Sequence, residues 1–220
     1  VTVNATLNDC AGNSSATTLS ANFSNYNAKQ FDIVINEIMA DPDPVVGLPN
    51  FEYVELLNRS LFPINLAQWQ LKYGTSFKTL PSASINPGEY VILCAANAYQ
   101  SLQSFGKTIV IPGLSSSAIT NSGTSLVIAD TSGKVIYAVN YLDTWYGNAD
   151  KVNGGFSLEQ IDVLNPCGGK SNWLASTNQL GGTPGTVNSI AANNPDNRAP
   201  SIKAICTETN NTIRVKFSEP

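Results

Sequence analysis

The sequence predicts an all-β protein, and three of its properties support this prediction. Only 13% of the 220 residues are charged, so the Glu, Lys and Arg that normally cover helix surfaces are scarce. Asn, Ser and Thr make up 64 residues, and Gly and Pro number 16 and 12, which favours turns and strand faces. Short apolar segments recur between turn groups, as is typical of a β-sandwich.

The chain opens on a predicted strand. Apolar and polar residues alternate from Val1 to Leu7, as a half-buried strand requires. The turn NDCAGN at 8–13 ends this strand. The polar stretch that follows, up to Gln30, predicts a linker with one short strand at 19–23.

Strand signals then follow at short intervals. The predicted strands are 31–39, 51–57, 69–73, 90–95, 107–111, 125–129 and 135–141. Turn sequences separate them, such as Asn-Pro-Gly before residue 90 and DTSG at 130–133. Residues 96–105 carry apolar side chains at helical spacing and predict a single short helical segment.

Beyond residue 141 the periodicity disappears, and Gly and Asn become frequent up to residue 188. We expect an ordered loop layer here, with aromatic rings that pack on one end of the sandwich. A linker at 191–200 then leads to a predicted hairpin in which Ile213, Val215 and Phe217 alternate with polar residues. Such a hairpin is too small to bury a core alone.

Eight segments stand in a recognisable order. They are INEIMADPDP (35–44), EYVELLN (52–58), INLAQWQLK (64–72), LPSASINPGEYVIL (80–93), SGTSLVIADTSGKVI (122–136), GGFSLEQID (154–162), NW (172–173) and GGTPGTVNS (181–189). Together they resemble the bacterial form of the lamin tail domain, a module of nuclear lamins that also occurs in bacterial surface and secreted proteins. The resemblance implies an immunoglobulin-like β-sandwich over residues 31–190, with the Gly- and Asn-rich loop layer as its last part.

The two flanks resemble parts of bacterial immunoglobulin-like domains. NDCAGN is similar to the end of such a domain, and APSIKAI with TIRVKFSEP is similar to its beginning. This implies that 1–30 ends a preceding domain and adds a linker, and that 201–220 opens a following one. Because unpaired strands seek partners, we expect VTVNATL and TIRVKF to pair, within one chain or in a strand-swapped homodimer.

Composition excludes several classes of function. Histidine is absent, which rules out Ser-His-Asp and Cys-His catalysis and zinc sites that contain His. The net charge is −4 and the 12 basic residues are scattered, so we expect no nucleic-acid partner. No apolar run approaches the roughly 18 residues of a membrane helix, so we expect no membrane span.

Five carboxylates within 19 residues form the strongest candidate metal site. They are Glu37, Asp41, Asp43, Glu52 and Glu55. Oxygen ligands without His or Cys suit a structural calcium ion, the one cofactor we consider. Alternatively, the Asp-Pro pairs simply form turns and the glutamates face solvent. A glycoside-hydrolase pair is a third interpretation, which the lack of an aromatic-lined cleft in the sequence disfavours.

Two further sets of side chains are candidates for binding or cross-linking. Trp145, Tyr146 and Trp173 either stack against sugar rings or anchor the loop layer. The pairs Cys94–Cys167 and Cys10–Cys206 are candidate disulfides, with free thiols as the alternative.

The functional hypothesis is a non-catalytic structural or interaction module of a bacterial surface or secreted multidomain protein. The low Lys content and high Asn, Ser and Thr content favour an extracellular or cell-surface location, with a protein or glycan partner. The alternative is an accessory, glycan-binding domain of a secreted hydrolase whose catalytic domain lies elsewhere. A hydrolase in its own right is a third and weaker hypothesis.

Overall fold

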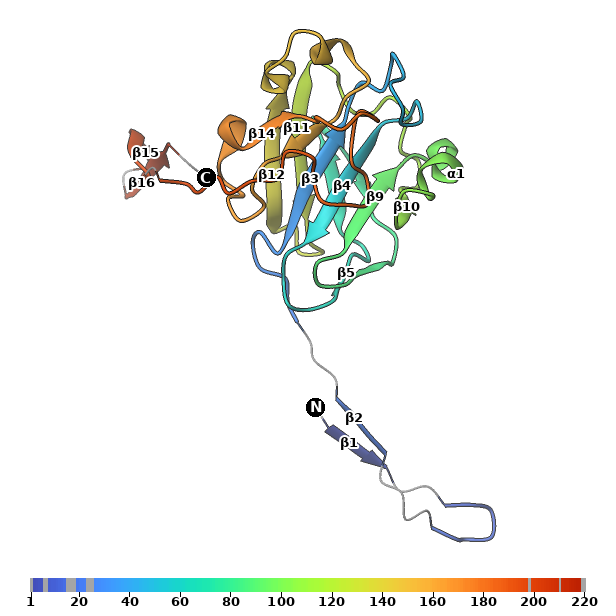
Figure 1. The fold of residues 1–220 in the computed structure, drawn as a ribbon. Helices are drawn as coiled ribbons and strands as arrows, with labels where there is room; N and C mark the ends of the chain where they lie inside the picture. The colour runs from blue at the N-terminus through green and yellow to red at the C-terminus, as the bar shows by residue number, and fades with distance from the viewer. Residues whose placement is uncertain are drawn as a thin grey trace.

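Two β-sheets face each other across the main core of the protein (Figure 1). The computed structural model describes residues 2–5, 8–14, 19–22, 26–197, 199–209 and 211–218. The larger sheet has six strands in the order β10-β9-β4-β3-β13-β14, and the smaller has the order β12-β11-β6-β7. The prediction of an all-β, immunoglobulin-like sandwich is confirmed.

The strands of both sheets are short. In the six-stranded sheet they are β3 (Ile33–Met39), β4 (Tyr53–Asn58), β9 (Tyr90–Cys94), β10 (Thr108–Val110), β13 (Leu158–Gln160) and β14 (Trp173–Ala175). In the four-stranded sheet they are β6 (Gln70–Tyr73), β7 (Ser76–Thr79), β11 (Gly123–Ala129) and β12 (Val135–Leu142). A small separate pair is formed by β5 (Ile64–Asn65) and β8 (Ser84–Ile85).

The predicted helical segment at 96–105 is present as the 3-10 turn η1 (Ala96–Ala98) and the single turn α1 (Tyr99–Leu102). Three further 3-10 turns follow β12. They are η2 (Asp143–Tyr146), η3 (Lys151–Asn153) and η4 (Gly169–Asn172). Among the described residues, no helix combines the length and the apolar character that crossing a membrane would need.

The seven strands predicted between 31 and 141 are all present, with ends shifted by at most two residues. The segment after residue 141 differs from the expectation, because β13 and β14 extend the six-stranded sheet there. Each has three residues, which is too short for an alternating pattern to show in the sequence. The same limit applies to β5 and β8, while β7 is a mostly exposed strand of four residues.

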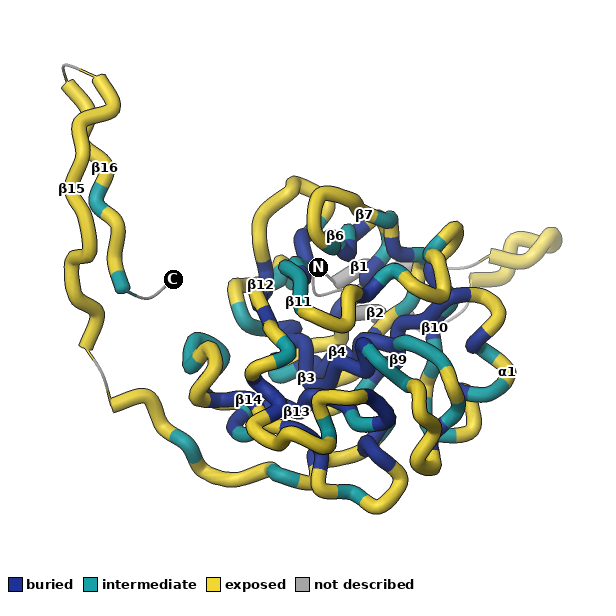
Figure 2. The backbone as a smooth tube through the Cα atoms, turned by 90° about the horizontal axis from the view of Figure 1, so that it is seen from above, coloured by how far each residue is buried: buried dark blue, intermediate teal, exposed yellow. Residues whose placement is uncertain are grey.

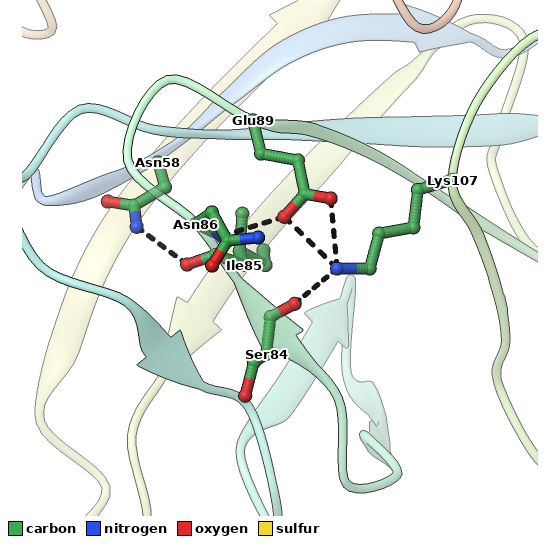
Figure 3. Close-up of polar contacts among 6 residues, drawn as sticks. All are labelled: Asn58, Ser84, Ile85, Asn86, Glu89 and Lys107. Carbon is green, nitrogen blue, oxygen red and sulfur yellow. Dashed lines mark hydrogen bonds and ion pairs between the residues drawn. The ribbon is translucent and has the colours of Figure 1, made fainter.

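The turn before β9 forms as the sequence predicts, and hydrogen bonds and an ion pair connect it to neighbouring elements (Figure 3). Gly88 takes a positive φ of 73°, which an Asn-Pro-Gly turn requires of its glycine. The Glu89 carboxylate accepts a hydrogen bond from the backbone N–H of Asn86 at 2.7 Å and forms an ion pair with Lys107 at 3.0 Å. Asn58, at the end of β4, donates its side-chain amide to the carbonyl of Ile85 at 2.8 Å.

Strands β3 and β4 are buried along their whole length (Figure 2). One face packs on the second sheet in the main core. The opposite face is partly covered by a small apolar cluster in which Leu48 and Leu102 pack against Met39, Tyr53 and Ile92. The chain after β14 also crosses this opposite face (Figure 1). We call residues 176–192 the strap segment.

A two-stranded hairpin lies at each end of the chain (Figure 1). Strand β1 (Thr2–Ala5) pairs with β2 (Leu19–Asn22), and β15 (Ile202–Thr209) pairs with β16 (Thr212–Phe217). The expectation that VTVNATL pairs with TIRVKF within one chain is therefore corrected, because each strand finds a partner close in sequence. Residues 1, 6 and 7 of the first segment lie outside the described residues. Strand exchange between two chains stays a prediction.

Candidate functional site

Three glutamates lie side by side on the face of the six-stranded sheet that points away from the second sheet. Glu37 on β3 is the cross-strand neighbour of Glu55 on β4 and of Glu159 on β13. All three side chains are 0% exposed. We call them the glutamate cluster.

Glu37 stands at the centre of this cluster. Its Oε1 accepts hydrogen bonds from the Tyr53 hydroxyl at 2.7 Å and from the Ser157 hydroxyl at 2.6 Å. The backbone N–H of Thr183, in the strap segment, donates to the same oxygen at 2.8 Å. Among the described residues, the other carboxylate oxygen of Glu37 has no hydrogen-bond partner.

The two neighbouring glutamates also accept hydrogen bonds from the strap segment. Oε2 of Glu55 accepts a short hydrogen bond from the backbone N–H of Gly185. Oε1 of Glu159 accepts from the Thr183 hydroxyl at 2.9 Å. Its Oε2 accepts from the Ser189 hydroxyl at 2.8 Å and from the backbone N–H of Ile190 at 3.2 Å. All three glutamates therefore act as acceptors for donors of one segment.

A β-bulge adds an amide pair to this arrangement. The register of β3 against β4 shifts between Ile35 and Glu37, so Asn36 is the extra residue. Its amide donates to Glu55 at 2.9 Å and to the side-chain oxygen of Asn188 at 2.7 Å. Asn188 in turn donates to the backbone carbonyl of Gln160 at 2.7 Å. The amide pair thus connects Asn188 of the strap segment to both β3 and β13.

The electrostatics of the cluster are unusual because, among the described residues, no Lys or Arg side chain forms an ion pair with it. The strap segment contains no charged residue, and every donor to the three carboxylates is an uncharged N–H or O–H group. Burial raises the pKa of Glu37 to about 7, and the nearby Glu159 adds to this effect. Burial, followed by repulsion from Glu37, also raises the pKa of Glu55 well above its ordinary value. This arrangement can bind protons and can hold a segment of chain.

The five predicted carboxylates do not come together as one site, because only Glu37 and Glu55 are cross-strand neighbours. Glu37 and Glu55 are engaged by the strap segment, whereas Glu52 accepts the backbone N–H of Ile119 at 2.8 Å. Burial raises the pKa of Glu52 to about 7. Asp43 is exposed and Asp41 is half-buried in the preceding turn. Across the part of the chain that the structure describes, no three Cys, Asp or Glu side chains form a group that could hold a metal ion.

The prediction of solvent-facing glutamates is also wrong for Glu37 and Glu55. Alternation places both on the face away from the second sheet, but the strap segment covers that face. Sequence reasoning missed Glu159 as a partner of the cluster. A signal was present, because Asn36, Glu37, Glu55 and Glu159 interrupt segments that are otherwise rich in apolar residues.

The aromatic set does not form a sugar-stacking platform. Trp145, Tyr146 and Trp173 are 9%, 4% and 2% exposed and belong to the main core. Their ring faces are therefore occupied by other core side chains. The alternative interpretation, that they anchor the chain after residue 141, agrees with this packing.

Neither candidate disulfide is present. Cys94 is a buried free thiol in β9 and is not bridged to Cys167. Cys10 and Cys206 are exposed free thiols. They belong to opposite terminal segments that do not pair with each other within the chain, which removes the reason for expecting an intramolecular bridge.

A groove of about 380 Å³ lies beside the strap segment. Asn36 and Asn188 of the amide pair contribute to its lining, together with Tyr90, Leu164 and Val187. Leu164 and Val187 are 77% and 63% exposed. The groove is therefore an apolar surface next to a buried polar cluster.

A comparison with protein-family models gives a match. The family model described as Lamin Tail Domain matches residues 27–143. A search of curated proteins finds no match. The matched range contains both sheets except β13 and β14, which the structure adds to the same six-stranded sheet.

Proposed function

Since the chain belongs to the lamin tail domain family, we propose that it is a non-catalytic structural and interaction module of a bacterial surface or secreted multidomain protein. Members of this immunoglobulin-like family are generally non-catalytic structural or interaction modules. The proposal concerns the setting of the module and the kind of partner that it binds.

One observation supports the non-catalytic part of the proposal most strongly. The glutamate cluster is the best-assembled group of acidic side chains among the described residues, and it is fully buried. A general acid or base must come within hydrogen-bond reach of its substrate. Here the donors of the strap segment and of the sheet occupy those positions.

The apolar groove supports a protein partner in preference to a glycan. Glycan binding relies on aromatic ring faces, and Tyr90 is the one aromatic residue that lines this groove. Leu164 and Val187 offer exposed aliphatic surface, which suits apolar side chains of another protein. The composition, poor in Lys and rich in Asn, Ser and Thr, supports an extracellular or cell-surface setting.

A hydrolysis assay with a matched variant tests the non-catalytic role. The chain is incubated with chromogenic glycosides, esters and phosphate esters at pH 5 and pH 8. We expect no turnover above that of the heat-denatured sample. Turnover that is lost in Glu159→Gln but kept in the exposed-site control Asp150→Asn would contradict the proposal.

The alternative, an accessory glycan-binding domain, is tested by electrophoresis in gels that contain cell-wall polysaccharides. We expect the mobility of the chain to match that in gels without polysaccharide. Retardation that disappears in Tyr90→Ala would instead support glycan binding at the groove.

A further inference from the structure

We propose that the glutamate cluster binds protons at Glu37 and Glu55 that keep the strap segment closed, and that loss of these protons as pH rises loosens the strap segment. The stability of the contact between the strap segment and this face of the sheet would then depend on pH. The inference goes beyond the proposed function and does not depend on it.

The geometry makes full ionisation of the cluster unfavourable. Directly opposed residues on neighbouring strands have Cβ atoms roughly 5 Å apart, and Glu37 has such a neighbour on each side. All three carboxyl groups are removed from solvent. A buried carboxylate without a compensating positive charge prefers to be neutral, and a second one nearby strengthens that preference.

The elements around the cluster supply no compensating charge. Strand β4 presents Tyr53 beside Glu37, and β9 presents Tyr90 near Glu55. Strand β13 presents only Glu159, and the strap segment presents uncharged donors. Lys151 binds the carbonyl of Ser176, at the start of the strap segment, instead of a member of the cluster.

Besides these contacts, the strap segment is held mainly by polar ones, namely backbone hydrogen bonds with Leu48, Ser157 and Ile161 and the amide pair. It contains no helix or strand. Two of its large apolar side chains, Leu180 and Val187, are 47% and 63% exposed and so contribute little burial. Segments with few buried apolar contacts open locally at lower free energy than the strands beneath them.

The direction of the pH effect follows from the raised pKa values. Glu37 has a pKa of about 7 when the strap is closed and an ordinary value near 4.5 when it is open to solvent. Below pH 4.5 both states hold the proton, so the stabilisation is complete. Between about pH 5 and pH 7 the open state loses the proton first, and opening becomes about tenfold more favourable per pH unit for each proton lost.

Hydrogen exchange of the whole chain tests this inference. Protection factors, corrected for the intrinsic pH dependence of exchange, are measured from pH 5 to pH 7 for the amides of Thr183, Gly185 and Ile190. Amides of Val54 and Leu93 in the strands beneath serve as internal references. We expect strap protection to fall by about tenfold to a hundredfold per pH unit, for one or two protons lost, while the reference amides change less.

A neutral isostere separates the charge from the hydrogen bonds. In Glu37→Gln the side-chain carbonyl can accept the three bonds that Oε1 accepts now, and the variant cannot ionise. We expect its strap protection to depend less steeply on pH and to exceed that of the wild type at pH 7. The control Asp150→Asn, which removes an exposed carboxylate, should retain the wild-type slope.

The outcomes divide clearly. Strap protection that is constant from pH 5 to pH 7, or an equal slope in Glu37→Gln and the wild type, overturns the proposal. If Glu37→Gln does not fold, carbon-13 NMR titration of the glutamate carboxyls in the wild type decides the matter. Titration of Glu37 or Glu55 near pH 7 or above supports the proposal, and ordinary titration of both overturns it.

Discussion

At the scale of single residues, Gly182 marks the closest approach of the strap segment to the sheet. A Cβ atom at this position would lie 2.5 Å from Oε1 of Glu37 and 2.8 Å from the Tyr53 hydroxyl. Neither atom can retreat easily, because each is buried and the two are hydrogen-bonded to each other. Only glycine therefore fits without displacing the strap segment.

We expect Gly182→Ala to lower the free energy of unfolding by about 1–3 kcal/mol, as overpacking typically does. Urea denaturation followed by circular dichroism measures this change. The control is Gly133→Ala, where φ is 82° and a Cβ atom would meet nothing within 4 Å. That variant carries only the cost of a left-handed backbone, about 1–2 kcal/mol. A neutral Gly182→Ala would show that the strap segment is not seated as described.

Cys94 provides a second test at this scale. The thiol is buried, and burial raises its pKa to about 11, so it is neither accessible nor ionised at neutral pH. We expect Ellman's reagent to label Cys10 and Cys206 quickly and Cys94 only after denaturation. Peptide mapping of labelled protein identifies the sites, and Cys94→Ala should lack the denaturation-dependent label. Fast labelling of Cys94 in native protein, or a bridged peptide that contains it, would contradict this account.

The burial of the glutamate cluster could be predicted from the sequence only in part. The interpretation that Glu37 and Glu55 face solvent is wrong, because the sheet face on which they lie is covered. The sequence pattern could not show that residues 176–192, more than a hundred positions later, return to cover that face. Glu37 and Glu55 are therefore buried hydrogen-bond acceptors, although their sequence pattern is typical of solvated side chains. Glu159, which is far away in the sequence, lies beside Glu37 because β13 pairs with β3.

At the scale of elements, the C-terminal hairpin buries little surface against the rest of the described chain. Residues of β15 are exposed along the strand, and β16 is nearly as exposed. Ile202, Ile205, Ile213 and Phe217 are between 50% and 65% exposed. Because a lone two-stranded hairpin is only marginally stable in water, this apolar surface favours association with another copy.

We expect the chain to self-associate through this hairpin, with a weight-average mass that rises with concentration in light scattering. Ile213→Lys should shift the protein toward the monomer, because it places a charge among the apolar side chains. Thr212→Lys, at the adjacent and oppositely directed position of β16, serves as the control and should associate as the wild type does. A mass equal to the monomer at every concentration would show that these strands do not attract one another.

Sequence patterns predicted elements well where strands were long enough to alternate. Strands β11 and β12, with seven and eight residues, were found within two residues of their ends. Strands β13 and β14 were missed, because three residues carry no usable period and their pairing is decided by distant partners. Because the sequence after residue 141 is rich in Gly and Asn, it predicts loops where the structure has β13 and β14.

At the scale of the whole molecule, the matched family range and the folded unit do not coincide. The match ends at residue 143, but β13 pairs with β3 and carries β14 at the edge of the sheet. Leu158 and Trp173 belong to the main core, with 0% and 2% exposure. The strap segment then closes over the glutamate cluster. Residues 144–192 therefore complete the sandwich.

Without these residues the sandwich loses large parts of its core. A chain of residues 27–143 would lack Trp173, and the loss of one buried Trp side chain typically costs about 3–5 kcal/mol. It would also leave β3 as an unpaired edge and open the buried face with Glu37 and Glu55 to solvent. Since whole domains are stable by only about 5–15 kcal/mol, the remaining strands cannot hold the native arrangement.

Chemical denaturation of two chains, 27–143 and 27–192, tests this claim most directly. We predict that 27–192 unfolds in one cooperative transition, with coincident changes in tryptophan fluorescence and circular dichroism. We predict no cooperative transition for 27–143. A 27–143 chain that unfolds cooperatively, with the midpoint and slope of the longer chain, would contradict the account.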